Sequence, residues 1–207
     1  MVDNPSHENR LPMRFILTLL LSAFALALVL KCGTRDRWLR FAAMAASSCG
    51  DIALMDFRGI MNRVRIPRLY AGAFFFIAAH ILYGAAFLWL IDWNRYSFVN
   101  AGFVSAAALV AAAGIAMAVM LRRARAGLSA VVLTYAYLSI IGAAMAVIFS
   151  YAFSAAAWRL VAAAGSLLFF LSDLIIGITE IAGVDAPYLR RLIWWLYAPG
   201  QALILAG

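Results

Sequence analysis

The chain has 207 residues, of which 67% are hydrophobic and only 13% are charged. A soluble domain is about half apolar and about a quarter charged, so this chain has too little polar surface to cover itself in water. Its formal net charge is +8, but the basic residues are scattered through short loops instead of forming a patch that would suit nucleic acid. The composition predicts an integral membrane protein surrounded by membrane lipids, and we expect no nucleic-acid partner.

The apolar residues lie in seven blocks, each bounded by charged residues, Trp or Pro. The blocks cover residues 13–31, 39–56, 70–91, 97–121, 128–149, 160–180 and 190–206. About 20 residues of helix cross a bilayer, and in lipid every backbone polar group needs a partner inside its own segment. We therefore predict an all-α, polytopic bundle of seven transmembrane helices. Residues 1–12 are a predicted polar tail and residues 13–207 a single domain, because no linker is long enough to divide them.

The 17 Lys and Arg residues are divided unevenly between the two ends of the predicted helices. The tail and the loops after the second, fourth and sixth blocks hold eleven of them, and the opposite end holds six. Basic residues are more frequent on the cytoplasmic side of membrane proteins. The count therefore favours an amino terminus inside and a carboxyl terminus outside, and we expect a multi-pass protein of the bacterial inner membrane.

Three ionisable residues other than tyrosine lie well inside the predicted helices: Asp51, His80 and Asp173. Asp51 and Asp173 both lie about 5 Å past the middle of their helices, toward the same side, and His80 lies near the centre of its own helix. Ionisable groups inside a membrane are costly and usually mark function. Interhelical hydrogen bonding is the alternative role for any one of them, but three at matched depth favour a functional pocket.

Five further polar residues on the predicted helices are candidates for substrate binding. They are Tyr83, Ser172, Tyr197, Gln201 and Tyr137. Tyr197 and Gln201 flank Pro199, whose missing N–H group frees a backbone carbonyl that needs a polar partner. Packing is the alternative role for a single tyrosine, since most of its surface is apolar.

Three classes of function fit buried acids in membrane helices. An intramembrane zinc hydrolase needs three or four protein ligands, and one membrane histidine with two acids is too few, so we expect neither a metal nor another cofactor. A proton-coupled or small-solute transporter, which could use the acids as relays, is the alternative, although the chain is short and has no clear inverted repeat. A hydrolase fits better, because one carboxylic acid can donate a proton while a second carboxylate activates water.

Four stretches resemble signatures of the YhhN family of membrane lysoplasmalogenases, in the same order and with similar spacing. They are Gly50-Asp51-Ile-Ala-Leu-Met, Gly72-Ala-Phe-Phe-Phe-Ile-Ala-Ala-His80-Ile-Leu-Tyr83, Gly165-Ser-Leu-Leu-Phe-Phe-Leu-Ser172-Asp173 and Tyr197-Ala-Pro-Gly-Gln201. The resemblance covers residues 10–207 and implies a helical bundle, usually of eight helices. It also implies hydrolysis of the vinyl ether bond of a lysoplasmalogen to a fatty aldehyde and a glycerophospho-base.

On this resemblance, Asp51 and Asp173 are the acid and the base, in either order. His80 and Tyr83 would orient water or one carboxylate, and Gln201 would bind the polar backbone of the lysolipid substrate. Vinyl ether hydrolysis passes through an oxocarbenium ion that water captures, much as glycosidases use two carboxyl groups. We therefore expect Asp51 and Asp173 to face one another across a shared pocket, with His80 beside them.

Overall fold

The structure is a computed structural model that describes residues 13–55, 67–94, 97–154, 157–184 and 186–207. These residues form seven α-helices and one short 3-10 turn, with no strand among them. The elements are α1 (Met13–Cys32), α2 (Arg35–Met55), α4 (Arg68–Leu88), α5 (Ala101–Arg123), α6 (Leu128–Ala152), η3 (Ala157–Arg159), α7 (Leu160–Glu180) and α8 (Pro187–Ala206). The all-helical prediction is confirmed, and each predicted block matches one helix to within four residues at either end. The predicted tail, residues 1–12, lies outside the described residues.

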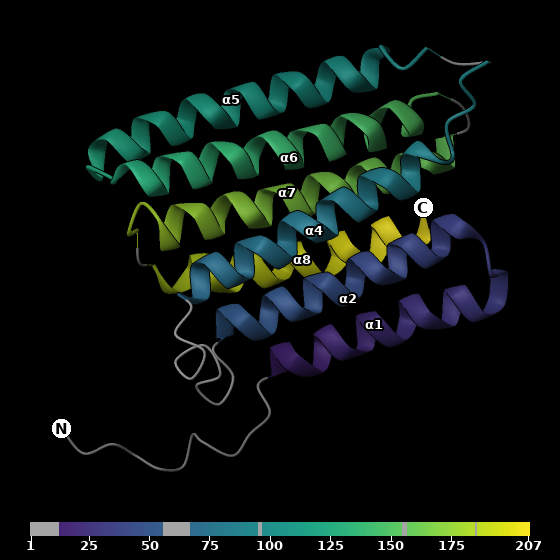
Figure 1. The fold of residues 1–207 in the computed structure, drawn as a ribbon, viewed down its shortest axis with the longest axis horizontal. Coiled ribbons are helices and arrows are strands. Elements are labelled where there is room, and N and C mark those ends of the chain that lie inside the picture. Colours follow the sequence, from purple (N-terminus) through teal and green to yellow (C-terminus); the bar gives the residue numbers. More distant parts are fainter. Residues whose placement is uncertain (1–12, 56–66, 95–96, 155–156, 185) are drawn as a thin grey trace.

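Consecutive helices run in alternating directions through one bundle (Figure 1). α1 forms one edge and packs against α2 and α8, whereas α5 forms the opposite edge and packs against α6. The most extensive pairings are between α2 and α4 and between α7 and α8. α6 contacts both α4 and α7. The helices that carry the membrane acids and the histidine (α2, α4 and α7) therefore lie together in the middle of the bundle.

Large apolar side chains cover the outside of the bundle. The exposed fraction is 61% at Leu20, 67% at Phe74, 68% at Ile115 and 77% at Trp195. Apolar surface of this extent is unfavourable in water and suits contact with lipid. Among the described helices, α4, α5, α6 and α7 with its preceding 3-10 turn are long and apolar enough to cross a membrane. The chain is therefore an integral membrane protein.

The helices α7 and α8 cross at two glycines. A Cβ atom on Gly165 would lie 2.7 Å from the carbonyl oxygen of Gly200, and one on Gly200 would lie 2.8 Å from the backbone nitrogen of Phe169. Small residues allow membrane helices to approach this closely. Pro199 lies inside α8 beside the crossing. The close approach brings the rings of Phe169 and Tyr197 into edge contact, with centroids 5.6 Å apart.

Arginines of α2 hold the carboxyl end of α8. Arg40 is only 2% exposed and donates hydrogen bonds to the carbonyl oxygens of Ile204, at 3.2 Å, and Leu205, at 3.5 Å. Arg37 also donates to the Leu205 carbonyl. Asp36 forms an ion pair with Arg40 at 3.3 Å. The last carbonyls of a helix lack partners within it and carry partial negative charge, so the two guanidinium groups satisfy them and anchor α8 against α2.

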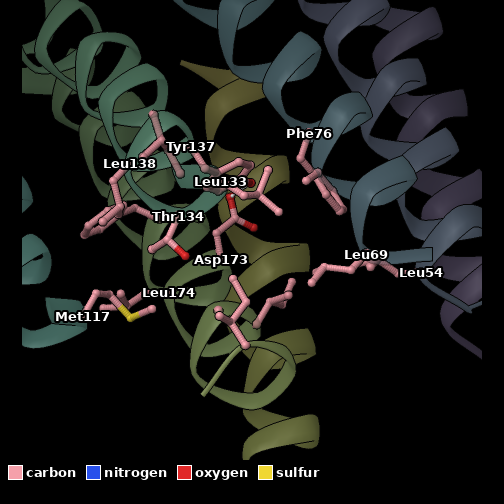
Figure 2. A pocket seen from close by; sticks show the side chains of 16 residues that line it. Leu54, Leu69, Phe76, Met117, Leu133, Thr134, Tyr137, Leu138, Asp173 and Leu174 are labelled. Atoms are coloured by element: carbon pink, nitrogen blue, oxygen red, sulfur yellow. Dashed lines mark hydrogen bonds between the residues drawn. The ribbon is translucent and has the colours of Figure 1, made fainter. Parts of the chain in front are cut away.

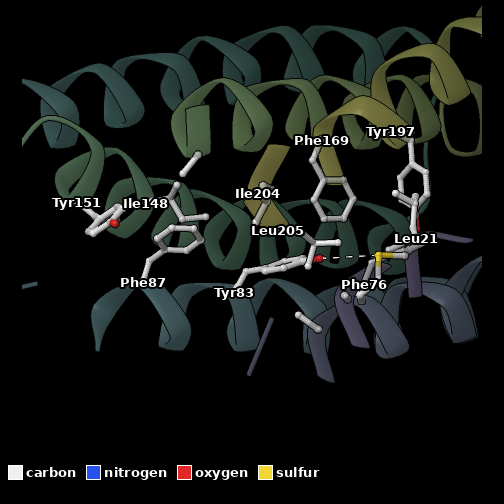
Figure 3. Close-up of a cluster of buried hydrophobic side chains, with 14 of the residues drawn as sticks. Leu21, Phe76, Tyr83, Phe87, Ile148, Tyr151, Phe169, Tyr197, Ile204 and Leu205 are labelled. Carbon is white, nitrogen blue, oxygen red and sulfur yellow. Dashed lines mark hydrogen bonds between the residues drawn. The ribbon is translucent and has the colours of Figure 1, made fainter. Parts of the chain in front are cut away.

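An aromatic core fills the space between α4, α7 and α8 (Figure 3). Tyr83, Phe87, Phe169 and Tyr197 are each at most 2% exposed. Phe169 makes edge contacts with both tyrosines, at centroid distances of 6.4 Å to Tyr83 and 5.6 Å to Tyr197. Edge-to-face packing is the arrangement that aromatic rings prefer. These rings give the middle of the bundle a rigid wall against which the polar groups described below are placed.

Candidate functional site

Asp51 lies on α2, where α1 and α8 also contact that helix, and is 5% exposed. Its Oδ2 atom accepts a hydrogen bond from Thr18 Oγ1 of α1 at 2.9 Å. The same oxygen accepts a second hydrogen bond from the Tyr197 hydroxyl of α8 at 2.7 Å. Hydrogen bonds to an ionised carboxylate are stronger than those between neutral groups. Two hydroxyl donors on one oxygen therefore suit a carboxylate that carries negative charge and accepts a proton.

Asp173 lies on α7 and is 6% exposed. Its Oδ2 atom accepts a hydrogen bond from the Tyr137 hydroxyl of α6 at 2.8 Å and lies 3.5 Å from His80 Nε2 of α4. Its other oxygen, Oδ1, is buried and has no hydrogen-bond partner among the described residues. A buried polar atom without a partner is uncommon and calls for an explanation. Oδ1 of Asp173 is therefore left to hold a proton or to meet a ligand.

His80 is oriented by the backbone of its own helix. Its Nδ1 atom lies 2.8 Å from the carbonyl oxygen of Phe76. A carbonyl only accepts hydrogen bonds, so Nδ1 carries a hydrogen and donates it. In the neutral ring Nε2 is then the nitrogen without a hydrogen, and it faces Asp173 Oδ2. His80 can therefore exchange a proton with that carboxyl group.

One aromatic ring connects the surroundings of the two carboxyl groups. Phe169 stacks on His80, with ring centroids 4.5 Å apart and planes 22° from parallel, and it contacts Tyr197 with its edge. In the described part of the chain, no three His, Cys, Asp or Glu side chains are grouped in a way that could hold a metal ion. The site consists of two carboxyls, each bound by at least one hydroxyl donor, and the Phe169 ring contacts one neighbour of each: His80 beside Asp173 and Tyr197 beside Asp51.

Asp173 lines an apolar pocket between α4, α6 and α7 (Figure 2). Its empty space is about 610 Å³, counted with the open mouth. The walls are almost entirely apolar, and their members include Leu54, Leu69, Phe76, Met117, Leu138 and Leu174. Figure 2 places the carboxyl group of Asp173 between the side chains of α4 and those of α6. Such walls suit a hydrocarbon chain, with the carboxyl as one of very few polar groups.

Asp51 lines a second pocket, between α2, α4, α7 and α8, with about 1210 Å³ of empty space counted with its open mouth. This pocket is polar, since Arg68, Glu180 and Arg190 line it and are exposed. Leu54 and Ile176 line both pockets and form their common wall. The structure therefore has two adjoining pockets where one shared pocket was predicted, because these two apolar side chains stand between them.

Nearly the whole chain matches one known protein family. The YhhN family model matches residues 9–207. The chain belongs to the YhhN family. No curated protein and no solved structure matches it. The resemblance expected from the four sequence stretches is thus confirmed, and in this YhhN protein those stretches contribute both carboxyls and His80 to the site.

Three of the predicted substrate-binding residues lie in the packed interior of the bundle, outside both pockets. The Tyr83 hydroxyl donates to Gln201 Oε1 at 2.5 Å, and Gln201 Nε2 donates to Ser47 Oγ at 3.1 Å. Ser172 is fully buried, and its hydroxyl has no partner among the described residues. Tyr83, Gln201 and Ser172 line neither of the two pockets. Their contact with substrate stays a prediction, and the observed bonds link α2, α4 and α8.

Tyr137 and Tyr197 occupy different places from these three. Tyr137 lines the apolar pocket and Tyr197 lines the charged one, and each donates a hydrogen bond to the carboxyl of its own pocket. Thr18, the second donor to Asp51, was not predicted from the sequence. The sequence feature that could have indicated Thr18 is its hydroxyl group within the apolar block of α1, but Ser22 offers a hydroxyl in the same block. Only the packing of α1 against α2 distinguishes the two.

Proposed function

We propose that this YhhN protein is a hydrolase of the bacterial inner membrane that cleaves the vinyl ether bond of a lysoplasmalogen, giving a fatty aldehyde and a glycerophospho-base. The observation that carries the proposal is the pair of adjoining pockets, one apolar with Asp173 and one charged with Asp51. A lysolipid is divided in the same way into a hydrocarbon chain and a charged headgroup. Its ether bond lies at the junction, which would fall near the common wall of the two pockets.

Asp173 is proposed to donate the first proton. Its Oδ1 atom has no hydrogen-bond partner among the described residues, and Asp173 lines the apolar pocket, where the alkenyl chain would lie. The proton goes to the vinyl carbon that does not bear oxygen, and the π electrons of the double bond form the new C–H bond. The resulting positive charge is shared by the other vinyl carbon and the ether oxygen. The Tyr137 hydroxyl stabilises the negative charge left on Asp173.

Asp51 is proposed to activate the water. As the water oxygen bonds to the carbon next to the ether oxygen, Asp51 takes one of its protons and a hemiacetal forms. The carbon–oxygen bond to the glycerol then breaks, and the leaving oxygen keeps the electron pair and receives the proton from Asp51. The hemiacetal hydroxyl returns its proton to Asp173 as the aldehyde forms. One water is consumed, and both carboxyl groups return to their starting states.

The proposal is tested by incubating purified protein in detergent with a lysoplasmalogen and measuring the aldehyde by mass spectrometry. Asp51→Asn and Asp173→Asn each remove a group that must gain or lose a proton, so each should lower turnover at least about 100-fold, the lower end of the usual range for acid–base catalysis. Asp92→Asn is the matched control, because Asp92 is exposed and lies outside both pockets. Near-normal turnover in both pocket variants would contradict the mechanism.

The position of protonation gives a second, independent test. In heavy water the mechanism puts one deuterium on the carbon next to the aldehyde carbonyl, which immediate reduction to the alcohol preserves for analysis. The corresponding saturated ether has no double bond to protonate and should be inert. Cleavage of the saturated ether, or an alcohol without the deuterium, would point to another reaction.

A proton-coupled transporter, the alternative function, can be distinguished from a hydrolase because it needs a gradient across a membrane. A hydrolase turns over substrate in detergent, where no membrane potential or pH difference exists. A proton-coupled transporter would be active only in sealed vesicles, with uptake of a solute and no chemical product. Gradient-dependent uptake without aldehyde formation would overturn the hydrolase proposal.

A further inference from the structure

The residues that line the two pockets all lie toward one end of the bundle. At this end α1, α4, α6 and α8 begin, and α2, α5 and α7 end (Figure 1). Counted from this end, no lining residue of either pocket lies more than one position beyond the middle of its helix. The predicted topology gives the same end eleven of the 17 Lys and Arg residues, so we name it the basic end. Both carboxyls are therefore reached from the basic end.

Packed side chains fill the opposite half of the bundle. Tyr83, Phe87, Ile148 and Tyr151 lie there and are each at most 3% exposed (Figure 3). The ring centroids of Phe87 and Tyr151 are 5.2 Å apart, and the guanidinium carbon of Arg40 lies 4.3 Å from the centroid of the Phe87 ring. Neither pocket has a lining residue in this layer. Among the described residues, the layer therefore separates both carboxyls from the leaflet around the opposite end.

The apolar pocket has a mouth on the side of the bundle, between α4 and α6. Toward the opposite end these helices are close, since a Cβ atom on Gly84 would lie 3.5 Å from Ala144. Toward the basic end the pocket separates them, and Figure 2 shows Asp173 of α7 between their side chains. The same stretches of the two helices carry the exposed Phe74 and Val132, so the hydrocarbon of one leaflet surrounds the mouth. Four partly exposed residues line the pocket there: Leu69 and Ala73 of α4, and Leu133 and Tyr137 of α6.

We infer that this mouth is a lipid portal, through which a single-chain lipid enters sideways between α4 and α6 from the cytoplasmic leaflet. The inference rests on the proposed function and adds the leaflet from which the substrate comes and the route that it takes. The charge count assigns the basic end to the cytoplasm.

The choice of leaflet follows from the placement of both pockets in the same half of the bundle. Moving a charged group out of water into hydrocarbon is costly. A lipid of the leaflet at the basic end can reach both pockets while its headgroup stays on the side of the membrane where it already lies. A lipid of the opposite leaflet would first have to carry its headgroup across the bilayer.

Labelling with an uncleavable lipid tests the portal without any dependence on catalysis. The probe is a saturated ether, hexadecylglycerophosphocholine, with a photoreactive diazirine near the ether end of its chain. It is added to sealed, energy-depleted membrane vesicles that contain the full chain and are either inverted or right-side-out. Its charged headgroup keeps the probe in the outer leaflet of each vesicle during a short incubation. Mass spectrometry then maps the labelling that an excess of unlabelled lipid displaces.

Inverted vesicles expose the cytoplasmic leaflet to the probe. They should therefore give at least about tenfold more displaceable labelling of residues 68–76 and 133–141 than right-side-out vesicles give. Detergent removes the barrier between the leaflets and should make the two preparations equal. Equal labelling in the sealed vesicles, or stronger labelling in the right-side-out ones, overturns the inference.

Tryptophan substitutions test the route between α4 and α6. Ala73→Trp places a large ring in the mouth and should lower displaceable labelling in inverted vesicles at least about fivefold. Leu133→Trp, on the facing wall, should do the same and replaces the first variant if thermal unfolding shows that Ala73→Trp does not fold. Ala112→Trp places the same ring on an exposed position of α5 and should leave labelling unchanged.

Unchanged labelling in a folded portal variant would also overturn the inference. Failure of the detergent-solubilised protein to turn over any vinyl ether would instead refute the proposed hydrolysis and leave the labelling results standing.

Discussion

The close crossing of α7 and α8 makes Gly165→Ala a quantitative test of how the site is positioned. The added Cβ atom would lie 2.7 Å from both the Gly200 carbonyl oxygen and the Ile204 backbone nitrogen, whereas ordinary contacts begin at 3.4 Å. Because these neighbours are backbone atoms that no rotamer change can move, the helices must separate by at least about 0.7 Å, the difference between the two distances. That separation moves Asp173 on α7 away from Tyr197 on α8.

Catalysis is sensitive to displacements of this size, since a 1 Å misplacement can cost about 100-fold in rate. We expect Gly165→Ala to lower kcat for vinyl ether hydrolysis by about 10- to 100-fold. Overpacking typically costs about 1–3 kcal/mol of stability, so thermal unfolding of the same detergent sample should show a folded but less stable protein. The assay measures aldehyde release over a range of substrate concentrations, at a temperature below the onset of unfolding.

Two glycines provide matched controls for this substitution. A Cβ atom on Gly84 would meet Ala144 at an ordinary 3.5 Å, and one on Gly114 would have no heavy atom within 4 Å among the described residues outside its own stretch of helix. Gly84→Ala and Gly114→Ala should therefore keep kcat within about twofold, and alanine also favours the helix by about 1 kcal/mol. Full activity of Gly165→Ala, or an equal loss of activity in Gly84→Ala, would show that the close crossing of α7 and α8 does not position the site.

Three further predictions concern the anchor of α8, the donor to Asp173 and the topology. Arg40→Ala should destabilise the protein by about 3 kcal/mol, because it removes the side-chain donor to the Ile204 carbonyl and the closer of the two arginine partners of Asp36. The exposed Arg123→Ala should change the free energy of unfolding by less than about 0.5 kcal/mol. Tyr137→Phe should lower turnover about tenfold, because it removes one hydrogen bond of about 1.5 kcal/mol to a charged group. Tyr135→Phe changes an exposed tyrosine of the same helix and should leave turnover unchanged. Equal effects of the two substitutions would argue against a special role for the contact between Tyr137 and Asp173. Reporter fusions should find the amino terminus in the cytoplasm and the carboxyl terminus outside, and finding both on one side would refute the seven-helix topology.

Composition and spacing were sufficient to predict the helices of this protein. Lipid offers no hydrogen bonds to the backbone, so a long apolar block must form a helix, whatever it packs against. The same rule made Asp51, His80 and Asp173 conspicuous, because each interrupts an apolar block. Their depths followed from the fixed rise of a helix, and that is why they could be predicted to lie near one level.

The partners of those groups were decided by the tertiary structure. Asp51 binds Tyr197, which is 146 positions away in the sequence, and Thr18 from a third helix. Such contacts depend on how each helix is rotated about its axis and how closely it approaches its neighbours. Periodicity constrains these quantities only weakly in a membrane, where both the lipid-facing and the buried side of a helix are apolar.

The division of the site into two pockets also depends on how the helices pack, and the sequence alone did not indicate it. Leu54 and Ile176 are unremarkable apolar residues in the sequence, yet they form the wall between the pockets of the two carboxyls. Arg40 likewise looks like a loop-side positive charge, and it is buried because the end of α8 happens to reach it. Which groups lie inside the membrane can be predicted from single segments, because it depends on how each segment is solvated. Which of those groups meet depends on packing between segments far apart in the chain, and for that the folded bundle is needed.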